Sequence, residues 1–401
     1  MRRRIRGYRF FMLIAVITAA IISFSGCEET EKEQNTKATV PAETAEEEEG
    51  LKLEAYQEGF YKLLTLEEMQ GKSAVDGFWY GQDQYVAVLR DLSSSKWSIV
   101  RKNIRTGEVT PAAACQTEQG TCVAVKLGKD GKVYCFGLDG KVLIYNAQWQ
   151  LEEVRDTGKE ISDFYFDSQR QNLYLIDDRA ELWCYHFPEA KLELLLQLDS
   201  AYTAYTLDGM LEEKQILLLS AYDEDGNDVA LYYSVETKEM ESGGNGRYNR
   251  LVSGNSILFW AYDNNIIKWV DTDHNRVVTS FALESKEETG EILYDDAGRL
   301  FMTNTYTDDS YAASVIRIYD KEQQEQVGQL QMDTKTDSFR LLTLNSAESD
   351  YAMLLCHSGQ DAEAEQKGTL LLWQYKAAIE QYTPSDTDQI SNYYAIGGDA
   401  V

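Results

Sequence analysis

The acidic segment around residue 225 is the part of the chain whose residue types could bind a hard cation. Its side chains place oxygen donors around a glycine, in the order Asp223-Glu224-Asp225-Gly226-Asn227-Asp228. Calcium prefers oxygen ligands of this kind, although the glutamate that closes an EF-hand loop is missing. The segment also separates two apolar, strand-like runs, which is typical of a hairpin turn. Two interpretations therefore stay open: a calcium site made by Asp223, Asp225 and Asp228, or a solvated turn.

Other residues that could do chemistry form no catalytic motif. The histidines His186, His274 and His357 are far apart and lack the spacing of metal ligands. Residues 93–96 have the Ser-x-x-Lys spacing of acyl-serine enzymes, but they join two expected strands rather than opening a helix. Residues 71–73 imitate the end of a phosphate-binding loop without its first glycine. The sequence therefore favours a non-catalytic protein. The alternative of an enzyme whose catalytic residues are scattered over several repeats stays open.

Tyrosine is twice as frequent as phenylalanine, 26 residues against 13. Its side chain offers an apolar face and a hydrogen-bonding tip to a protein or a sugar. Tyrosine also favours strands and packs between sheets, so a structural role is the alternative for each one. Six tyrosines near expected turns are candidate contact residues: Tyr202, Tyr205, Tyr222, Tyr262, Tyr306 and Tyr311.

The six cysteines divide into three groups. Cys27 belongs to the N-terminal segment described below. Cys115 and Cys122 are close enough in sequence to form a disulfide across one connection in an oxidising compartment. The other three stand among apolar neighbours and are expected to be buried thiols: Cys135, Cys184 and Cys356.

The first 27 residues have the order of an export signal. Five arginines precede an uncharged apolar run over residues 10–24, and small residues lead to Cys27. The ending Phe24-Ser25-Gly26-Cys27 resembles the lipobox of bacterial lipoproteins, which implies a lipid on Cys27 and a place at the extracytoplasmic face of the cell membrane. The alternative is an uncleaved anchor over residues 10–27, at the lower limit for spanning a bilayer.

The acidic balance of the chain limits its partners. The net charge is -29, and removing the five arginines of the signal makes it -34. A surface of this sign repels phosphate backbones, so we expect no nucleic-acid partner. Residues 28–50 contain nine glutamates and two lysines with almost no large apolar side chain, which predicts a disordered linker.

From about residue 73 the chain consists of short apolar or alternating runs separated by turn dipeptides such as Asp130-Gly131, Asp139-Gly140 and Ala297-Gly298. Strand-forming segments recur, and seven of their residues are spaced by 37 to 56 positions: Lys102, Tyr145, Tyr185, Tyr233, Val270, Tyr319 and Tyr375. This period predicts an all-β, seven-bladed β-propeller over residues 51–383, although six or eight blades also fit. Residues 51–71 could supply the strand that closes the ring, or a short helix from Thr65. Residues 384–401 are a loose, polar tail.

A family resemblance supports this interpretation. The turn at residues 103–109, with weaker echoes at 271–277 and 320–327, is similar to the strand-turn-strand repeats of bacterial quinoprotein-like and WD40-like propellers. The Gly-His and Trp-Asp signatures of WD40 repeats are missing, and so is the tryptophan that follows the Thr-Gly turn in quinoproteins. The resemblance implies the fold, and the missing tryptophan argues against quinone-cofactor chemistry.

Together these patterns predict a membrane-anchored, extracytoplasmic propeller that acts as a non-catalytic scaffold for a protein partner or for envelope organisation. Two alternatives stay open. One is a module that binds a glycan or another ligand through aromatic side chains at one mouth of the ring. The other is a propeller enzyme, either a quinoprotein-like oxidoreductase or a lyase. Calcium is the one cofactor that the residues suggest.

Overall fold

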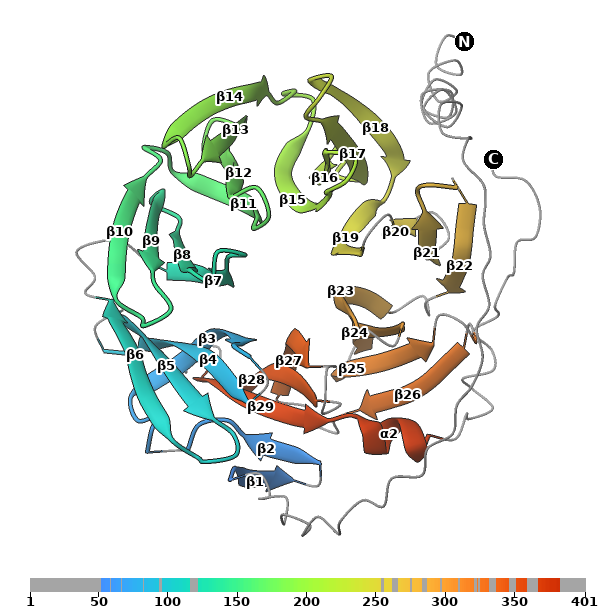
Figure 1. Cartoon of the computed structure of the whole chain (residues 1–401). Coiled ribbons are helices and arrows are strands. Elements are labelled where there is room, and N and C mark those ends of the chain that lie inside the picture. Colours follow the sequence, from blue (N-terminus) through green and yellow to red (C-terminus); the bar gives the residue numbers. More distant parts are fainter. Residues whose placement is uncertain are drawn as a thin grey trace, which may run out of the picture.

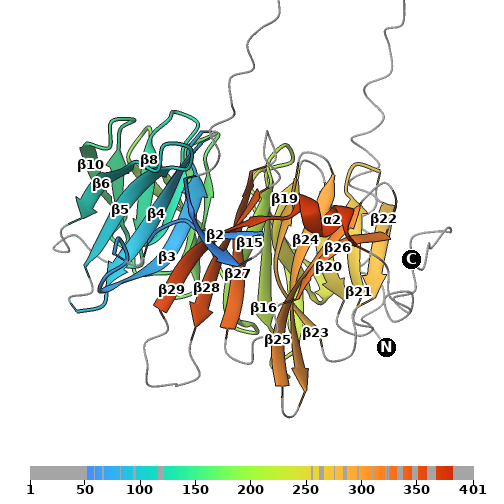
Figure 2. The same cartoon turned by 90° about the horizontal axis from the view of Figure 1, so that it is seen from below.

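Seven antiparallel sheets are arranged in a ring around a central axis (Figure 1). The computed structural model describes residues 52–382 except 58, 66, 82, 94–95, 116–121, 254–255, 262–265, 275, 283–286, 296–297, 309–310, 321–322, 324, 332–336, 346–350 and 359–366. The prediction of an all-β propeller with seven blades is confirmed. Figure 2 shows the same ring from the side, with the strands of each blade crossing its thickness.

Each blade contains four consecutive strands, counted from the axis outward, except that the last blade borrows its outer strands from the start of the chain. Blades 1 to 3 are formed by β3 (Lys72–Trp79), β4 (Gln84–Asp91), β5 (Trp97–Asn103) and β6 (Val109–Cys115); β7 (Cys122–Leu127), β8 (Val133–Gly137), β9 (Lys141–Tyr145) and β10 (Leu151–Asp156); and β11 (Ile161–Asp167), β12 (Asn172–Asp177), β13 (Glu181–His186) and β14 (Lys191–Gln197).

Blades 4 to 6 continue with β15 (Thr203–Leu211), β16 (Ile216–Tyr222), β17 (Asp228–Ser234) and β18 (Glu239–Asn245); β19 (Arg247–Ser253), β20 (Ser256–Ala261), β21 (Ile266–Asp271) and β22 (Arg276–Ala282); and β23 (Glu287–Tyr294), β24 (Arg299–Asp308), β25 (Tyr311–Asp320) and β26 (Glu325–Gln331). Blade 7 contains β27 (Asp337–Asn345), β28 (Tyr351–Ser358) and β29 (Lys367–Gln374), joined by β2 (Phe60–Lys62) and β1 (Glu54–Gln57). The short helix α2 (Lys376–Glu380) follows.

The core consists of separate apolar layers, one between each pair of neighbouring blades. Blade 2 shows why: on β8, Val133 and Cys135 pack against blade 1, while Tyr134 and Phe136 pack against blade 3. Successive side chains of a strand point to opposite faces, so a sheet covered on both sides has apolar residues at consecutive positions. The continuous apolar runs in the sequence therefore mark blades that are buried on both faces.

The predicted turn chemistry is also present. Gly131, Gly140, Gly226 and Gly298 have φ angles of 76°, 79°, 79° and 83° in the hairpins that they form. This left-handed conformation suits glycine because it has no Cβ. The predicted buried thiols Cys135, Cys184 and Cys356 are free and buried.

The start of the chain closes the ring. Strand β2 pairs with β29, with Phe60 opposite Trp373, and the two rings stack with centroids 6.2 Å apart. The Leu63 amide donates to the Leu370 carbonyl at 3.1 Å, so the pairing continues past the strand. The predicted closing strand is therefore present, and it joins the first described residues to the last blade.

Residues 67–71 form a hydrogen-bonded turn and not the short helix from Thr65 that was the alternative expectation. The Thr65 amide donates to the Glu68 carboxylate at 2.6 Å, and the Glu68 amide donates to the Thr65 hydroxyl at 3.2 Å. This reciprocal pair is the capping box of a helix start. Glu68 also accepts a hydrogen bond from the buried Lys102 ammonium at 3.2 Å, which fixes the turn against blade 1.

A charged cluster holds the segment that connects blades 2 and 3 against blade 3. The Lys159 ammonium contacts the carboxylates of Asp177 at 2.9 Å and Glu181 at 3.3 Å, and lies 3.6 Å from the centre of the Trp183 ring. The indole N–H of Trp183 also donates to Asp177 at 3.1 Å. Burial alone would raise the pKa of Asp177, but Lys159 and the backbone amides of Glu181 and Arg179 outweigh it and lower that pKa.

Replacing Phe60 by Ala should destabilise the propeller by about 3 kcal/mol, because it empties a buried aromatic position in the closing strand. The midpoint of urea unfolding should fall accordingly. Tyr56→Ala is the matched control: Tyr56 lies on β1 and is 39% exposed, so its loss should change the midpoint little. Equal shifts for the two variants would show that ring closure does not depend on β2.

Asp177→Asn should destabilise the protein at neutral pH and progressively less as the pH falls. The pKa of Asp177 is lower in the folded protein, so its ionised form stabilises the fold above the unfolded pKa of about 3.9 and loses this effect as the pH falls through the folded pKa. Thermal midpoints of the two proteins should therefore converge below about pH 4. Asp139→Asn, at a half-exposed pair with Lys141, serves as the control, with a small difference at every pH.

Candidate functional site

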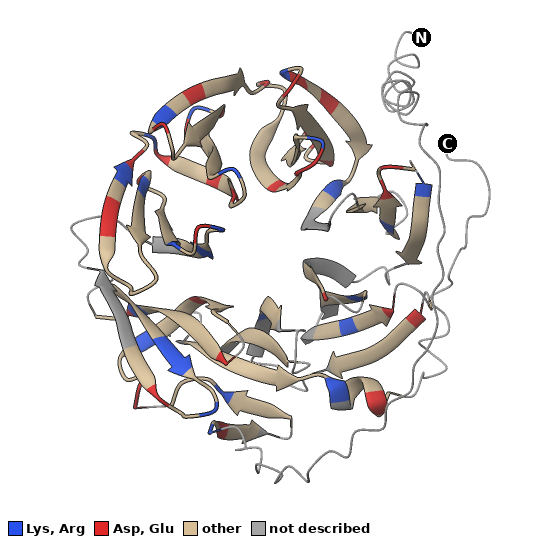
Figure 3. Ribbon diagram, viewed as in Figure 1, with Lys and Arg blue, Asp and Glu red and all other residues tan. Residues whose placement is uncertain are grey.

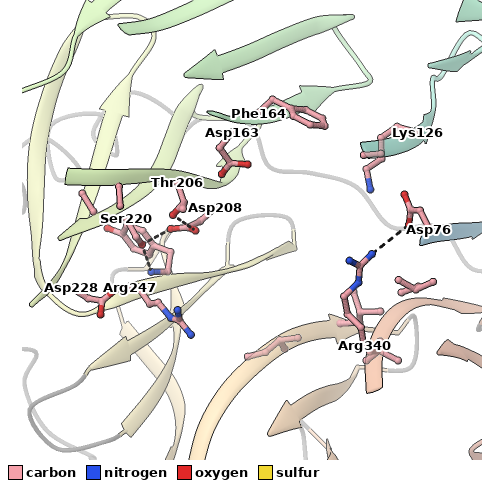
Figure 4. Close-up of a pocket in the computed structure, with 18 of the residues that line it drawn as sticks. Asp76, Lys126, Asp163, Phe164, Thr206, Asp208, Ser220, Asp228, Arg247 and Arg340 are labelled. Carbon is pink, nitrogen blue, oxygen red and sulfur yellow. Dashed lines mark hydrogen bonds and ion pairs between the residues drawn. The ribbon is translucent and has the colours of Figure 1, made fainter. Parts of the chain in front are cut away.

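The first strands of all seven blades surround a central cavity of about 590 Å³. It is lined by residues of β3, β7, β11, β15, β19, β23 and β27, together with the adjoining ends of β16 and β17 (Figure 4). A cavity of this size suits a small organic ligand, for which volumes of about 300 to 1,000 Å³ are usual.

Each of these first strands is irregular where it borders the cavity. The register with the second strand shifts in all seven blades, for example between Ala74 and Asp76 in blade 1 and between Ile161 and Asp163 in blade 3. An extra residue in one strand bends it and changes the direction of the next side chain. The irregularities therefore occur at the same place in every blade, next to the side chains that line the cavity.

Two cavity carboxylates join neighbouring blades. Asp76 of blade 1 accepts a hydrogen bond from the Val125 amide of blade 2 at 3.2 Å, and Asp163 of blade 3 accepts one from the Leu207 amide of blade 4 at 2.9 Å. Val125 and Leu207 are buried, so their amides need an acceptor inside the protein. Both aspartates thus satisfy a backbone donor of the following blade.

Blades 4 and 5 are joined in a similar way, but here a serine hydroxyl lies between the carboxylate and the backbone amide. The Ser220 hydroxyl donates to the Asp208 carboxylate and accepts from the Tyr248 amide at 3.3 Å, while the Thr206 hydroxyl donates to Asp208 at 3.2 Å. Burial, with the Asp208 charge adding to it, raises the pKa of the Tyr248 hydroxyl well above its ordinary value. That phenol stays protonated at neutral pH and cannot act as a general base.

The cationic side chains of the cavity are divided between two sides (Figure 4). Lys126 and Arg340 extend toward Asp76, and the Arg340 guanidinium lies 3.8 Å from that carboxylate. On the other side lie Asp228 and Arg247, whose guanidinium stands 4.9 Å from the centre of the Trp260 ring. The cavity therefore holds four carboxylates and three cations, with different mixtures at its two sides.

Two of the residues singled out in the sequence lie in this cavity wall. Tyr222 and Asp228 are opposite each other at the ends of β16 and β17, and Tyr222 is 40% exposed. Tyr205 is buried instead, and its hydroxyl donates to the Asp199 carbonyl at 2.7 Å. Tyr202 is half-buried and packs edge-on against Tyr205.

The remaining predicted residues are not described by the structure. Tyr262 and Cys27 lie outside the described residues. Tyr306 and Tyr311 have described backbone in β24 and β25, and Cys115 and Cys122 in β6 and β7, but their side chains are outside the described part. Their predicted roles, including the disulfide, stay predictions.

The candidate calcium segment is a hairpin turn between β16 and β17. One Asp223 carboxylate oxygen accepts from the backbone amides of Asp225 at 2.9 Å and Asn227 at 2.8 Å. The backbone and side-chain amides of Asn227 hold the pKa of Asp223 below its usual range. Within the described residues no group of three His, Cys, Asp or Glu side chains is placed to hold a metal. Asp228 points to the cavity side, and calcium binding by Asp223, Asp225 and Asp228 stays a prediction.

A Cys-His-Asn cluster on blade 3 was missed because Asn172, on the neighbouring strand, meets His186 only through the strand pairing. The His186 Nδ1 atom lies 2.9 Å from the Asn172 side-chain oxygen and 3.9 Å from the Cys184 sulfur. Burial, together with the Glu193 charge, raises the pKa of Cys184 to about 12. A nucleophilic cysteine needs a thiolate, so this buried thiol is structural.

The polar residues of the cavity were missed for a different reason. Asp76-Gly77 and Asp208-Gly209 have the same dipeptide that predicts turns elsewhere, yet both stand inside first strands. An Asp-Gly pair within an apolar run, near the start of a repeat, was the available signal. At Gly77, an added Cβ would lie 2.9 Å from the Met353 sulfur, so glycine allows blade 7 to approach.

Comparison with known proteins shows the fold and no more. No family model matches the chain, and no curated protein sequence is similar to it. A chain in the crystal structure of a mitotic checkpoint complex is 11% identical, with a TM-score of 0.50 over 88% of this chain and 99% of that one. A prolyl endopeptidase is 10% identical, with a TM-score of 0.52 over 76% of this chain. This chain spans half the length of that enzyme.

These similarities concern the fold alone, a ring of antiparallel sheets. Among the described residues no helix is long and apolar enough to cross a lipid bilayer.

Asp163→Ala should destabilise the protein by about 1–3 kcal/mol, because the buried Leu207 amide loses its acceptor. Asp163→Asn keeps an acceptor oxygen and should lose less. The matched control is Asp228→Ala, at another cavity aspartate whose carboxylate forms no hydrogen bond with a described residue. Chemical unfolding measures all three, and an Asp228→Ala loss equal to that of Asp163→Ala would contradict the role of Asp163 as a link between blades.

Proposed function

We propose that this chain is a non-catalytic binding propeller that is exported and held at the extracytoplasmic face of the membrane by a lipid on Cys27. The observation that carries the binding role is the use of the cavity carboxylates. Asp76 and Asp163 accept backbone amides of the next blade, and Asp208 holds the Ser220 hydroxyl that does the same. Carboxylates committed to the scaffold leave a polar, preformed cavity suited to binding.

The position of the first described residues supports a tether on the side away from the Tyr222 hairpin. The Lys52 amide donates to the Ile104 carbonyl at 2.9 Å, beside the hairpin between the third and fourth strands of blade 1. Strands alternate in direction, so this hairpin and the β16–β17 hairpin lie on opposite faces of the ring. If the chain enters the ring at the face beside Lys52, the opposite end of the cavity, where Tyr222 and Asp228 lie, stays accessible to a partner.

The charge of the chain favours a partner with a neutral or basic surface. Acidic and basic residues are interspersed around the ring (Figure 3), but the net charge of the chain is -29. At physiological salt, charges act over about 8 Å, so the acidic excess disfavours polyanions near the surface.

A second candidate function is the binding of a glycan or another extracellular ligand in the cavity. It is favoured by Tyr222, because an exposed tyrosine at a cavity wall presents both an apolar face and a hydroxyl to a ligand. The peptidase activity named for the structural neighbour belongs to a protein of which this chain covers only half.

Expression of the full chain in a bacterial host tests the tether and the partner together. The chain should fractionate with membranes and incorporate radioactive palmitate, whereas Cys27→Ala should do neither and Ser25→Ala should behave like the wild type. After crosslinking of intact envelopes, pull-down should recover a protein partner. Tyr222→Ala should reduce this recovery severalfold, while Tyr56→Ala, of matched exposure on the outer rim, should not.

Palmitate in the Cys27→Ala variant would exclude the lipid at this residue. Glycan retention without any crosslinked protein would favour the second function. Recovery that is insensitive to Tyr222→Ala would place the partner away from the cavity.

A further inference from the structure

We infer that the central cavity binds the free carboxylate of a short peptide, held between Lys126 and Arg340. The inference rests on the proposed function, because it names the ligand class of the same cavity. The two cations come from β7 of blade 2 and β27 of blade 7, on either side of Asp76 in blade 1. Three blades therefore contribute one charged side of the cavity (Figure 4).

This side of the cavity carries one more positive than negative charge. Lys126 is exposed and forms no hydrogen bond or ion pair with another described residue. The Arg340 side chain is 45% exposed, and its contact with Asp76 is long, at 3.8 Å. Asp76 accepts the Gly77 and Val125 amides at 2.9 and 3.2 Å, so part of its hydrogen-bonding capacity is already used. An added carboxylate would balance the second cation.

The residue types favour a carboxylate over a lone ammonium or a neutral group. A guanidinium offers parallel N–H donors that match the two oxygens of a carboxylate, and a lysine adds a point charge beside them. The chain has a net charge of -29, so this positively charged side of the cavity differs in sign from the protein as a whole. Such a reversal attracts an anionic group that is small enough to enter.

The rest of the cavity limits what is attached to that carboxylate. Asp163, Asp208 and Asp228, from blades 3 and 4, disfavour a second negative charge and favour an amine. Apolar side chains, including Phe164, Ile292 and Leu341, line other parts of the wall. A ligand with one carboxylate, an apolar body and an amine satisfies all three conditions, and a short peptide with free ends has this chemistry.

Isothermal titration of the purified full chain with tri-alanine tests the inference. Tri-alanine should bind about tenfold more tightly than tri-alanine amide, which lacks the carboxylate, and more tightly than succinate, which carries two carboxylates. Lys126→Met and Arg340→Met should each weaken tri-alanine binding about tenfold and remove most of the preference for the acid over the amide. Methionine keeps an unbranched apolar stem, so packing is largely preserved.

Lys141→Met and Arg276→Met, which remove cations outside the cavity, are the matched controls and should bind tri-alanine like the wild type. Equal affinity for acid and amide, tighter binding of succinate, or no binding of tri-alanine would overturn the inference, whereas capture of a protein partner at the membrane would still support the proposed function. Mass spectrometry of the peptide after titration separates the two claims further. Cleaved tri-alanine would support the ligand class and overturn the non-catalytic role.

Discussion

The burial of both faces of every blade is the constraint on which the rest of the structure depends. A four-stranded sheet with apolar side chains at consecutive positions has no face to give to water. Strand β8 shows this directly, since Val133 and Tyr134 belong to different apolar layers. Each blade is therefore complete only between two neighbours, and a linear row of blades would leave two apolar faces exposed. Closing the ring removes both ends.

Closure explains why the first described strand belongs to the last blade. Strand β2 completes blade 7, and Leu63 and Leu64 then enter the apolar layer between blades 7 and 1. The segment is also joined to blade 1 through the pair of Glu68 with Lys102. The start of the chain thus contacts both sides of the junction that would otherwise be the open edge of the ring.

The polar centre follows from the same packing. Where the first strands converge, the amides of Val125, Leu207 and Tyr248 are buried and face the preceding blade rather than a strand of their own sheet. A side-chain acceptor is the available solution, and Asp76, Asp163 and Ser220 provide it. Asp76 and Asp163 line the cavity because they link blades. Their presence in the cavity is therefore not in itself evidence for acid–base catalysis, and in our proposal the cations beside them select the ligand.

The sequence predicted the parts that depend on local patterns. Strand runs and Asp-Gly hairpins are readable within one blade, and the repeat through Tyr145, Tyr185 and Tyr233 predicted a seven-bladed ring with six or eight blades as alternatives. The cavity depends on residues as distant as Asp76 and Arg340, whose meeting is a property of the closed ring. Tyr222 was found because it adjoins a turn, and Asp228 because it belongs to the acidic segment beside it. Lys126 stands in an ordinary strand, and only the curvature of the ring brings it to the axis, so no pattern within one repeat could have assigned it to a site.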